Sequence, residues 1–236
     1  MNNLNSKINI SEVKKKMLDK FCVFFAESGF KLYKKDYRFK KETNQSIIDF
    51  SFEFLDFYPS HIEYSFACFI SLKDIRKIEK EYFLYYNEPL HPTWHFLIAE
   101  GEFIHDLLNK ERKYKRAYKN EISNQENLET ALEQTFRIVK QNALPKAYSL
   151  DNLSNFQDYI FSDPSVITAR LSEHLFIQAC LFAAYLRNEQ CYRDLISYLE
   201  TELNTLEANG QQFSNIRKII SKVDTFVDHK NVPTAN

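Results

Sequence analysis

Two adjacent segments with a strict two-residue repeat constrain the fold of this chain most. Apolar side chains occupy every second position in each: Ile48, Phe50, Phe52 and Phe54 in the first, and Ile62, Tyr64, Phe66, Cys68 and Ile70 in the second. Successive side chains of a strand point to opposite faces, so each segment predicts a strand with one buried face. The short connection FYPSH contains proline and serine, which favours an antiparallel hairpin.

Helical and turn signals precede this hairpin. Asn9 and Glu12 form a capping-box pattern for a helix over residues 10–28, and Gly29 stands where a left-handed C-terminal cap is needed. The segment FKLYKKDYRFKK alternates aromatic and charged residues. It predicts one strand, or two short strands with a turn near Lys35 and Asp36.

The remainder of the chain carries mostly helical patterns. A helix is expected from about residue 71, then a short strand over 93–99 and a further helix after Gly101. The helix that begins after Ser123 is expected to stop near Pro145. The expected helices after it are a short one around 153–160, capped by Ser149 or Asp151, a long apolar one from Asp163 and Pro164, and two at 189–208 and 212–228.

This order of elements predicts an α+β fold. An N-terminal helix and an antiparallel sheet of about four strands occupy residues 1–120, and a helical region occupies 121–236. No Gly/Ser-rich or Pro-rich linker separates the two regions, so we expect them to pack as one compact unit.

Composition restricts the environment and the partners. The net charge is −1, with +4 in residues 1–119 and −5 in the remainder, which falls short of the basic excess typical of nucleic-acid binders. The four cysteines include no CxxC pair, which indicates reduced thiols. No secretion signal and no membrane-length apolar window is recognisable, so we expect a soluble cytoplasmic protein without a membrane partner.

The segment HPTWH holds the strongest candidates for a ligand site. His91 and His95 would project to the same side of an extended segment, beside Trp94 and near Glu100. Aromatic walls with a few polar groups are typical of ligand pockets. A metal site would need His105 as a further ligand, and no spacing brings it close, so neither a metal nor another cofactor is predicted. A half-buried histidine beside a tryptophan explains the same pattern.

Two other groups of residues could carry chemistry. Asp49, Glu53 and Asp56 could act as an acid/base set, but their alternation with core residues predicts a solvated strand face. The basic residues of 31–41 alternate with aromatic ones, as in some nucleic-acid surfaces. An edge strand protected by lysines gives the same pattern, and the near-zero net charge favours this second interpretation.

Several segments together resemble an uncharacterised bacterial family named domain of unknown function 4304. They are ESGFKLYKKDYRFKK, the strand pair SIIDFSFEF and HIEYSFACFI, and LETALEQTFRIVKQNALPKAYSL, with Phe39, Leu144, Pro145 and Tyr148 at the corresponding places. The resemblance covers about residues 10–200 and implies the same α+β fold and a bacterial origin. It supplies no catalytic residues.

No catalytic signature or glycine-rich phosphate loop can be written anywhere in the sequence. The sequence also contains 21 Phe and 14 Tyr, residue types that are favoured at interfaces, although AT-rich codons would enrich them too. The leading hypothesis is therefore a non-enzymatic protein-binding module, such as a bacterial immunity or accessory protein whose partner is a toxin or another protein. The alternative is a small-ligand-binding protein or enzyme that uses the site around His91.

Overall fold

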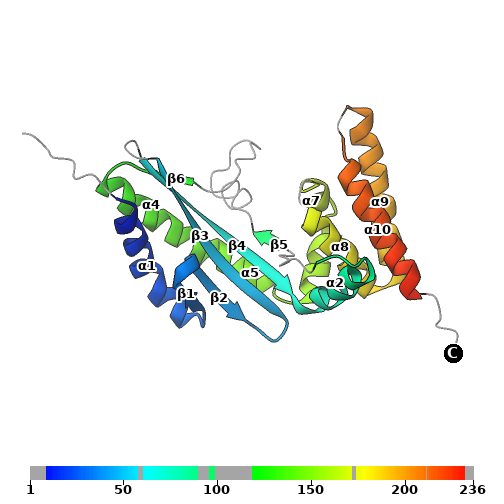
Figure 1. Cartoon of the computed structure of the whole chain (residues 1–236), viewed down its shortest axis with the longest axis horizontal. Coiled ribbons are helices and arrows are strands. Elements are labelled where there is room, and N and C mark those ends of the chain that lie inside the picture. The colour runs from blue at the N-terminus through cyan, green and yellow to red at the C-terminus, as the bar shows by residue number, and fades with distance from the viewer. Residues whose placement is uncertain are drawn as a thin grey trace, which may run out of the picture. The chain divides into compact units, whose positions relative to one another are not determined.

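The computed structural model describes residues 9–57, 61–89, 96–98, 119–171, 174–210 and 212–231. They form the α+β fold that the sequence predicts (Figure 1). Two compact units are present, Met1–Ile70 with Leu97–Ser149 and Ser71–Phe96 with Leu150–Asn236. This division differs from the expected boundary near residue 120, because the helix that follows the fourth strand packs on the C-terminal helices and so belongs with them.

The described residues form one sheet of six strands, two more than expected. Their bounds are β1 Lys31–Tyr33, β2 Arg38–Glu42, β3 Ser46–Phe57, β4 His61–Leu72, β5 Phe96–Ile98 and β6 Lys119–Ile122. The order is β1-β2-β3-β4-β5, and β6 pairs with β4. β1 therefore lies at an edge of the sheet. Both strands predicted from the alternating pattern, β3 and β4, are confirmed, and each is twelve residues long.

The first helix, α1 (Ile10–Glu27), confirms the predicted caps. The Asn9 side chain accepts a hydrogen bond from the backbone N–H of Glu12 at 2.9 Å. Gly29 has a φ of +80°, the left-handed conformation that glycine adopts at least cost. The chain therefore leaves α1 at Glu27 and enters β1 at Lys31 after three linking residues.

Aromatic rings fill the space between α1 and the sheet. Phe25 lies 4.4 Å from Phe39 and 4.9 Å from Phe50, measured between ring centroids. Phe21 lies 5.0 Å from Phe52. α4 (Gln125–Ile138) runs beside α1 (Figure 1) and receives a 2.8 Å hydrogen bond from the Tyr64 hydroxyl at the Ala131 carbonyl. These contacts place the aromatic positions of the alternating pattern in one core.

The helical chain does not stop at Pro145, contrary to expectation. α4 continues into a π-helical turn, η2 (Val139–Ala143), and then into α5 (Leu144–Ser149). In this turn the Leu144 N–H donates to the Val139 carbonyl, five residues back. Pro145 has no N–H to donate, and a π-turn directly before it changes the hydrogen-bond register, so the helical path continues past the missing bond.

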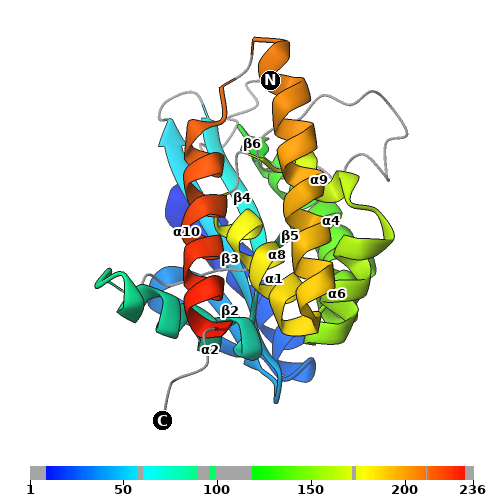
Figure 2. The ribbon, with the colours of Figure 1, turned by 90° about the vertical axis from the view of Figure 1, so that its right-hand side faces the viewer.

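The second unit is helical. Its helices are α2 Lys73–Tyr85, α6 Leu153–Ser162, α7 Ser165–Thr168, α8 His174–Arg187, α9 Glu189–Ala208 and α10 Ser214–Asn231. α9 and α10 lie along α8 (Figure 2), which is buried over most of its length. Of the helices in the described ranges, none has both the length and the apolar character needed to cross a bilayer.

Two predictions for this unit are wrong in detail. The long helix expected from Pro164 is divided into α7 and α8, because the N–H groups of Arg170 and Leu171 bond to carbonyls three residues back, as in a turn. The cap of α6 is Asn152, whose side chain accepts from the Asn155 N–H at 2.9 Å, and neither Ser149 nor Asp151 takes this role.

Candidate functional site

The ligand site expected around HPTWH lies outside the described residues. His91, Trp94, His95 and Glu100 all belong to the ranges 90–95 and 99–118, as does His105. The prediction that these side chains converge on a pocket therefore stays a prediction. Among the described residues, charged and aromatic side chains gather on β1, β2 and β3.

The carboxylate set is only partly the solvated face that the alternation predicts. Glu53 and Asp56 are exposed, as expected. The prediction is wrong for Asp49, whose side chain is 0% exposed. Its Oδ1 accepts a 3.1 Å hydrogen bond from Arg38 Nε, its Oδ2 accepts another from Arg38 Nη2, and Lys40 Nζ lies 3.7 Å from Oδ2. Asp49 is thus the buried anion of a charge cluster.

Strand register explains why this cluster forms. Asp49 lies directly opposite Lys40 in the antiparallel β2–β3 pair, and Arg38 lies opposite Ser51, one step along the same face. The neighbouring Phe39 and Phe50 point to the other face, toward α1. Two cations of β2 therefore neutralise one carboxylate of β3, and two of the six basic residues of 31–41 are held within the fold.

Three of the remaining four basic residues of this segment, all but Lys41, belong to a patch that we call the basic edge. It consists of Lys31, Leu32 and Tyr33 of β1 with Lys34 and Lys35 of the 3-10 turn η1 (Lys34–Asp36), and all five are exposed. Within the part of the chain that the structure describes, its three lysines have no carboxylate partner. The interpretation of 31–41 as a lysine-bearing edge strand is confirmed for β1.

The aromatic residues of this segment are mostly engaged inside the fold. Phe30 and Phe39 are buried. The Tyr37 ring lies 5.2 Å from that of Phe54, and Lys14 Nζ lies 4.9 Å from its centroid. Tyr33 is 48% exposed, with Lys40 Nζ 5.4 Å from its ring. One tyrosine of the four aromatics is thus available to a partner.

Lys41 fixes the strand that supports the basic edge. Its Nζ donates to the Ser28 carbonyl and to the Tyr148 hydroxyl, both at 3.0 Å. A cation beside the last carbonyls of a helix is favoured by the helix dipole, and this contact joins β2 to the ends of α1 and α5. Lys41 and Tyr148 belong to two of the segments that carry the family resemblance, which the structure brings into contact.

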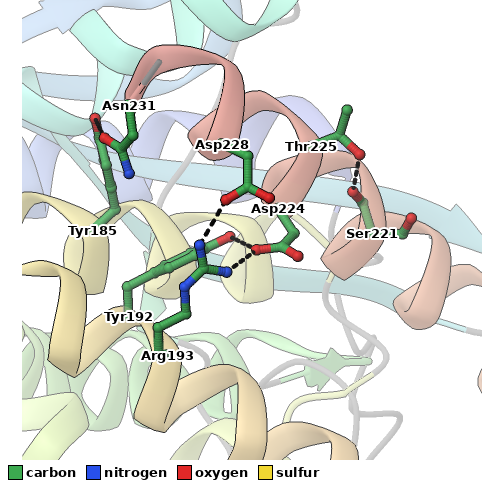
Figure 3. A network of polar contacts seen from close by, with 8 residues as sticks. All are labelled: Tyr185, Tyr192, Arg193, Ser221, Asp224, Thr225, Asp228 and Asn231. Carbon is green, nitrogen blue, oxygen red and sulfur yellow. Dashed lines mark hydrogen bonds and ion pairs between the residues drawn. The ribbon is translucent and has the colours of Figure 1, made fainter. Parts of the chain in front are cut away.

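The second unit holds a polar network between α9 and α10 (Figure 3). Arg193 Nη1 and Nη2 donate to Asp224 and Asp228, both at 2.6 Å, and the Tyr192 hydroxyl donates to Asp224 at 3.3 Å. Burial and the neighbouring Asp224 carboxylate raise the pKa of Tyr192, so its hydroxyl stays protonated at neutral pH. Both carboxylates face an arginine, so this network joins two helices and offers no activated nucleophile.

Neither metal binding nor thiol chemistry has a suitable cluster of side chains in the described ranges. No three His, Cys, Asp or Glu side chains there lie close enough to hold a metal ion. All four cysteines are free thiols, and Cys68 and Cys180 are buried. Burial, with a contribution from Asp49, raises the pKa of Cys68, so this thiol is a poor nucleophile.

Comparison with known protein families, with curated proteins and with solved structures finds no match. The resemblance to domain of unknown function 4304 therefore stays a prediction.

Proposed function

We propose that this chain is a non-enzymatic protein-binding module, of the immunity or accessory type, that binds an acidic partner protein at the basic edge. The observation that supports the proposal is the set of three exposed lysines, Lys31, Lys34 and Lys35, which no carboxylate of the described residues neutralises. Complementary charge steers association and determines partner choice. Exposed Tyr33 and Leu32 add apolar contact area between these charges.

A protein partner accounts for this patch better than a nucleic acid does. Binding single strands without sequence preference uses several aromatic rings on which bases stack. At the basic edge, Tyr33 alone of the described aromatics of 30–41 is widely exposed, and the total charge of −1 gives no long-range attraction to phosphates. The four free thiols support a reducing compartment, and we place the protein in the cytoplasm.

Charge reversal tests the proposal. The triple variant Lys31→Glu/Lys34→Glu/Lys35→Glu is compared with Lys77→Glu/Lys80→Glu/Lys218→Glu, which makes the same charge change at exposed helical lysines of the second unit. Each protein carries a photo-crosslinker at Tyr33 and is exposed to extract of the native host. We expect a defined crosslinked protein with the wild type and the helical variant, and its loss with the edge variant.

Two results would reject the proposal. One is that no crosslinked protein forms with the wild type under low-salt conditions that preserve weak complexes. The other is equal crosslinking with both triple variants, which would mean that the three lysines of the basic edge do not contribute to partner binding. Circular dichroism of each variant confirms that the fold is retained.

A further inference from the structure

We infer that the partner binds by adding an extended acidic segment as a new strand beside β1. This inference depends on the proposed function, since it names how the basic edge recognises its partner. Strand addition needs outward-facing backbone groups at a sheet edge and a side-chain pattern that selects the added strand. β1 has both the outward-facing backbone groups and the side-chain pattern.

The hydrogen bonds of β2 determine which way its backbone faces. The N–H of Phe52 in β3 donates to the carbonyl of Tyr37 at 3.1 Å. Because the peptide bond between Tyr37 and Arg38 is planar and trans, the N–H of Arg38 points away from β3. Backbone direction alternates along a strand. The N–H and C=O of Arg38 and Lys40 therefore face the opposite way, toward β1.

The register of β1 then identifies its outward-facing residue. Tyr33 is opposite Arg38 and Lys31 is opposite Lys40, so the backbone groups of both β1 residues are directed at β2. Leu32 lies between them, and its N–H and C=O are directed away from the sheet. No turn or loop hydrogen bond of the described backbone involves these two groups of Leu32.

The side chains around Leu32 select the added strand. Lys31 and Tyr33 lie on the sheet face that carries Lys40 and Asp49, whereas Leu32 lies on the face of α1. A strand beside β1 would place alternate residues on these two faces. The matching sequence has a carboxylate opposite Lys31, an apolar residue opposite Leu32 and acidic residues that continue toward Lys34 and Lys35.

The charge of the edge also excludes a second copy of this chain as the added strand. A second copy of β1 would bring its Lys31, Lys34 and Lys35 close to the same three lysines of the first copy, and such a concentration of like charge disfavours the pairing. β1 has only three residues, so few backbone bonds are gained and a weak, transient complex is expected. We therefore assign the edge to an acidic segment of a different protein.

A designed peptide tests this inference without the native partner. The probe is the N-acetylated, C-amidated heptapeptide Glu-Val-Glu-Val-Glu-Val-Glu, and the control is a block peptide with the same four Glu followed by the same three Val. Both are titrated into the full-length ¹⁵N-labelled chain. We expect the alternating peptide to bind, to shift the Leu32 amide resonance and to slow its hydrogen exchange, whereas the block peptide binds several-fold more weakly.

Two substitutions at Leu32 separate backbone from side-chain recognition. Leu32→Pro removes the outward N–H and is compatible with an edge position, whereas Leu32→Ala keeps the N–H and shortens the side chain. Loss of one net hydrogen bond corresponds to about 2- to 10-fold weaker binding. We expect this loss for Leu32→Pro beyond any effect of Leu32→Ala. Unchanged resonances of the sheet away from β1 confirm that Leu32→Pro is folded.

The outcomes distinguish this inference from the proposed function. Equal binding of both peptides, or of Leu32→Pro and Leu32→Ala, would reject strand addition while leaving charge-dependent partner binding in place. Absence of binding by the alternating peptide would also reject it. A twelve-residue oligothymidylate could instead bind more tightly than the alternating peptide, with an affinity that falls steeply as salt rises. That result would reject both strand addition and the proposed function, and would favour a nucleic-acid partner.

Discussion

The buried charge cluster at Asp49 yields a sharp prediction. Arg38→Met removes both hydrogen bonds of the guanidinium to the carboxylate and keeps a long apolar side chain. Asp49 is 0% exposed, so its charge would remain without its main partner. Removing one partner of a buried ion pair typically costs 3–5 kcal/mol. Lys40 stays at 3.7 Å, so we expect about 3 kcal/mol, the lower end of that range.

The assay is thermal and urea unfolding at pH 7. For a chain of this length, about 3 kcal/mol corresponds to a fall in melting temperature of about 6–12 °C. The matched control is Lys35→Met on the exposed turn, where a change within about 0.5 kcal/mol is expected. The double variant Arg38→Met/Asp49→Leu removes both charges and should recover most of the loss, because apolar replacement of a buried pair is often neutral.

Two results would refute this reasoning. A cost below about 1 kcal/mol for Arg38→Met would mean that Asp49 does not depend on the guanidinium. A double variant less stable than the single one would mean that the Asp49 site does not tolerate an apolar side chain. In either case the cluster would not be the reason that a carboxylate lies in this sheet.

Three further predictions concern other sites. Gly29→Ala should destabilise the fold by about 1–2 kcal/mol in urea unfolding, because alanine is strained at a φ of +80° although the nearest side-chain atoms leave room for its methyl group. The pKa of Tyr192 is raised in the folded state, so the stability it contributes is complete below the ordinary tyrosine pKa of about 10 and is lost as pH rises above it; phenolate absorbance should show Tyr192 ionising only with unfolding. Iodoacetamide should modify the half-buried Cys22 in the native protein but Cys68 only in denaturant, as peptide mass spectrometry would show.

Local signals in the sequence predicted the local features of this fold. The caps at Asn9 and Gly29 and the two-residue repeat of β3 and β4 depend on neighbours within a few positions, and all are confirmed. The edge position of β1 also followed from the lysines of residues 31–41, which alternate with aromatic residues. Such features are set by backbone preference and by the burial of one face, which a single sequence records directly.

The errors arise where contacts between distant residues override the local pattern. Asp49 occupies a position that the alternation assigns to solvent, yet the register with β2 brings Arg38 and Lys40 against it. Nothing near Asp49 in the sequence indicates this register. The helix through Pro145 similarly depends on a π-turn, whose hydrogen-bond shift has no residue signature of its own. At the candidate site, the sequence supplied the lysines and the aromatics, but only packing distinguishes exposed Tyr33 from buried Phe39.

The discontinuous second unit has a consequence for synthesis of the chain. α2 emerges from the ribosome well before α10, yet the Tyr86 hydroxyl donates to the Lys222 carbonyl across 136 residues of sequence. At about 5–20 residues per second, roughly 7–27 s separate the appearance of these two partners. During that interval Tyr82 and Tyr85 of α2 lack the Phe226 ring of α10, whose centroid lies 5.5 Å and 5.7 Å from theirs in the folded chain. A nascent chain stalled in this window is therefore a substrate for chaperones that recognise exposed apolar helices.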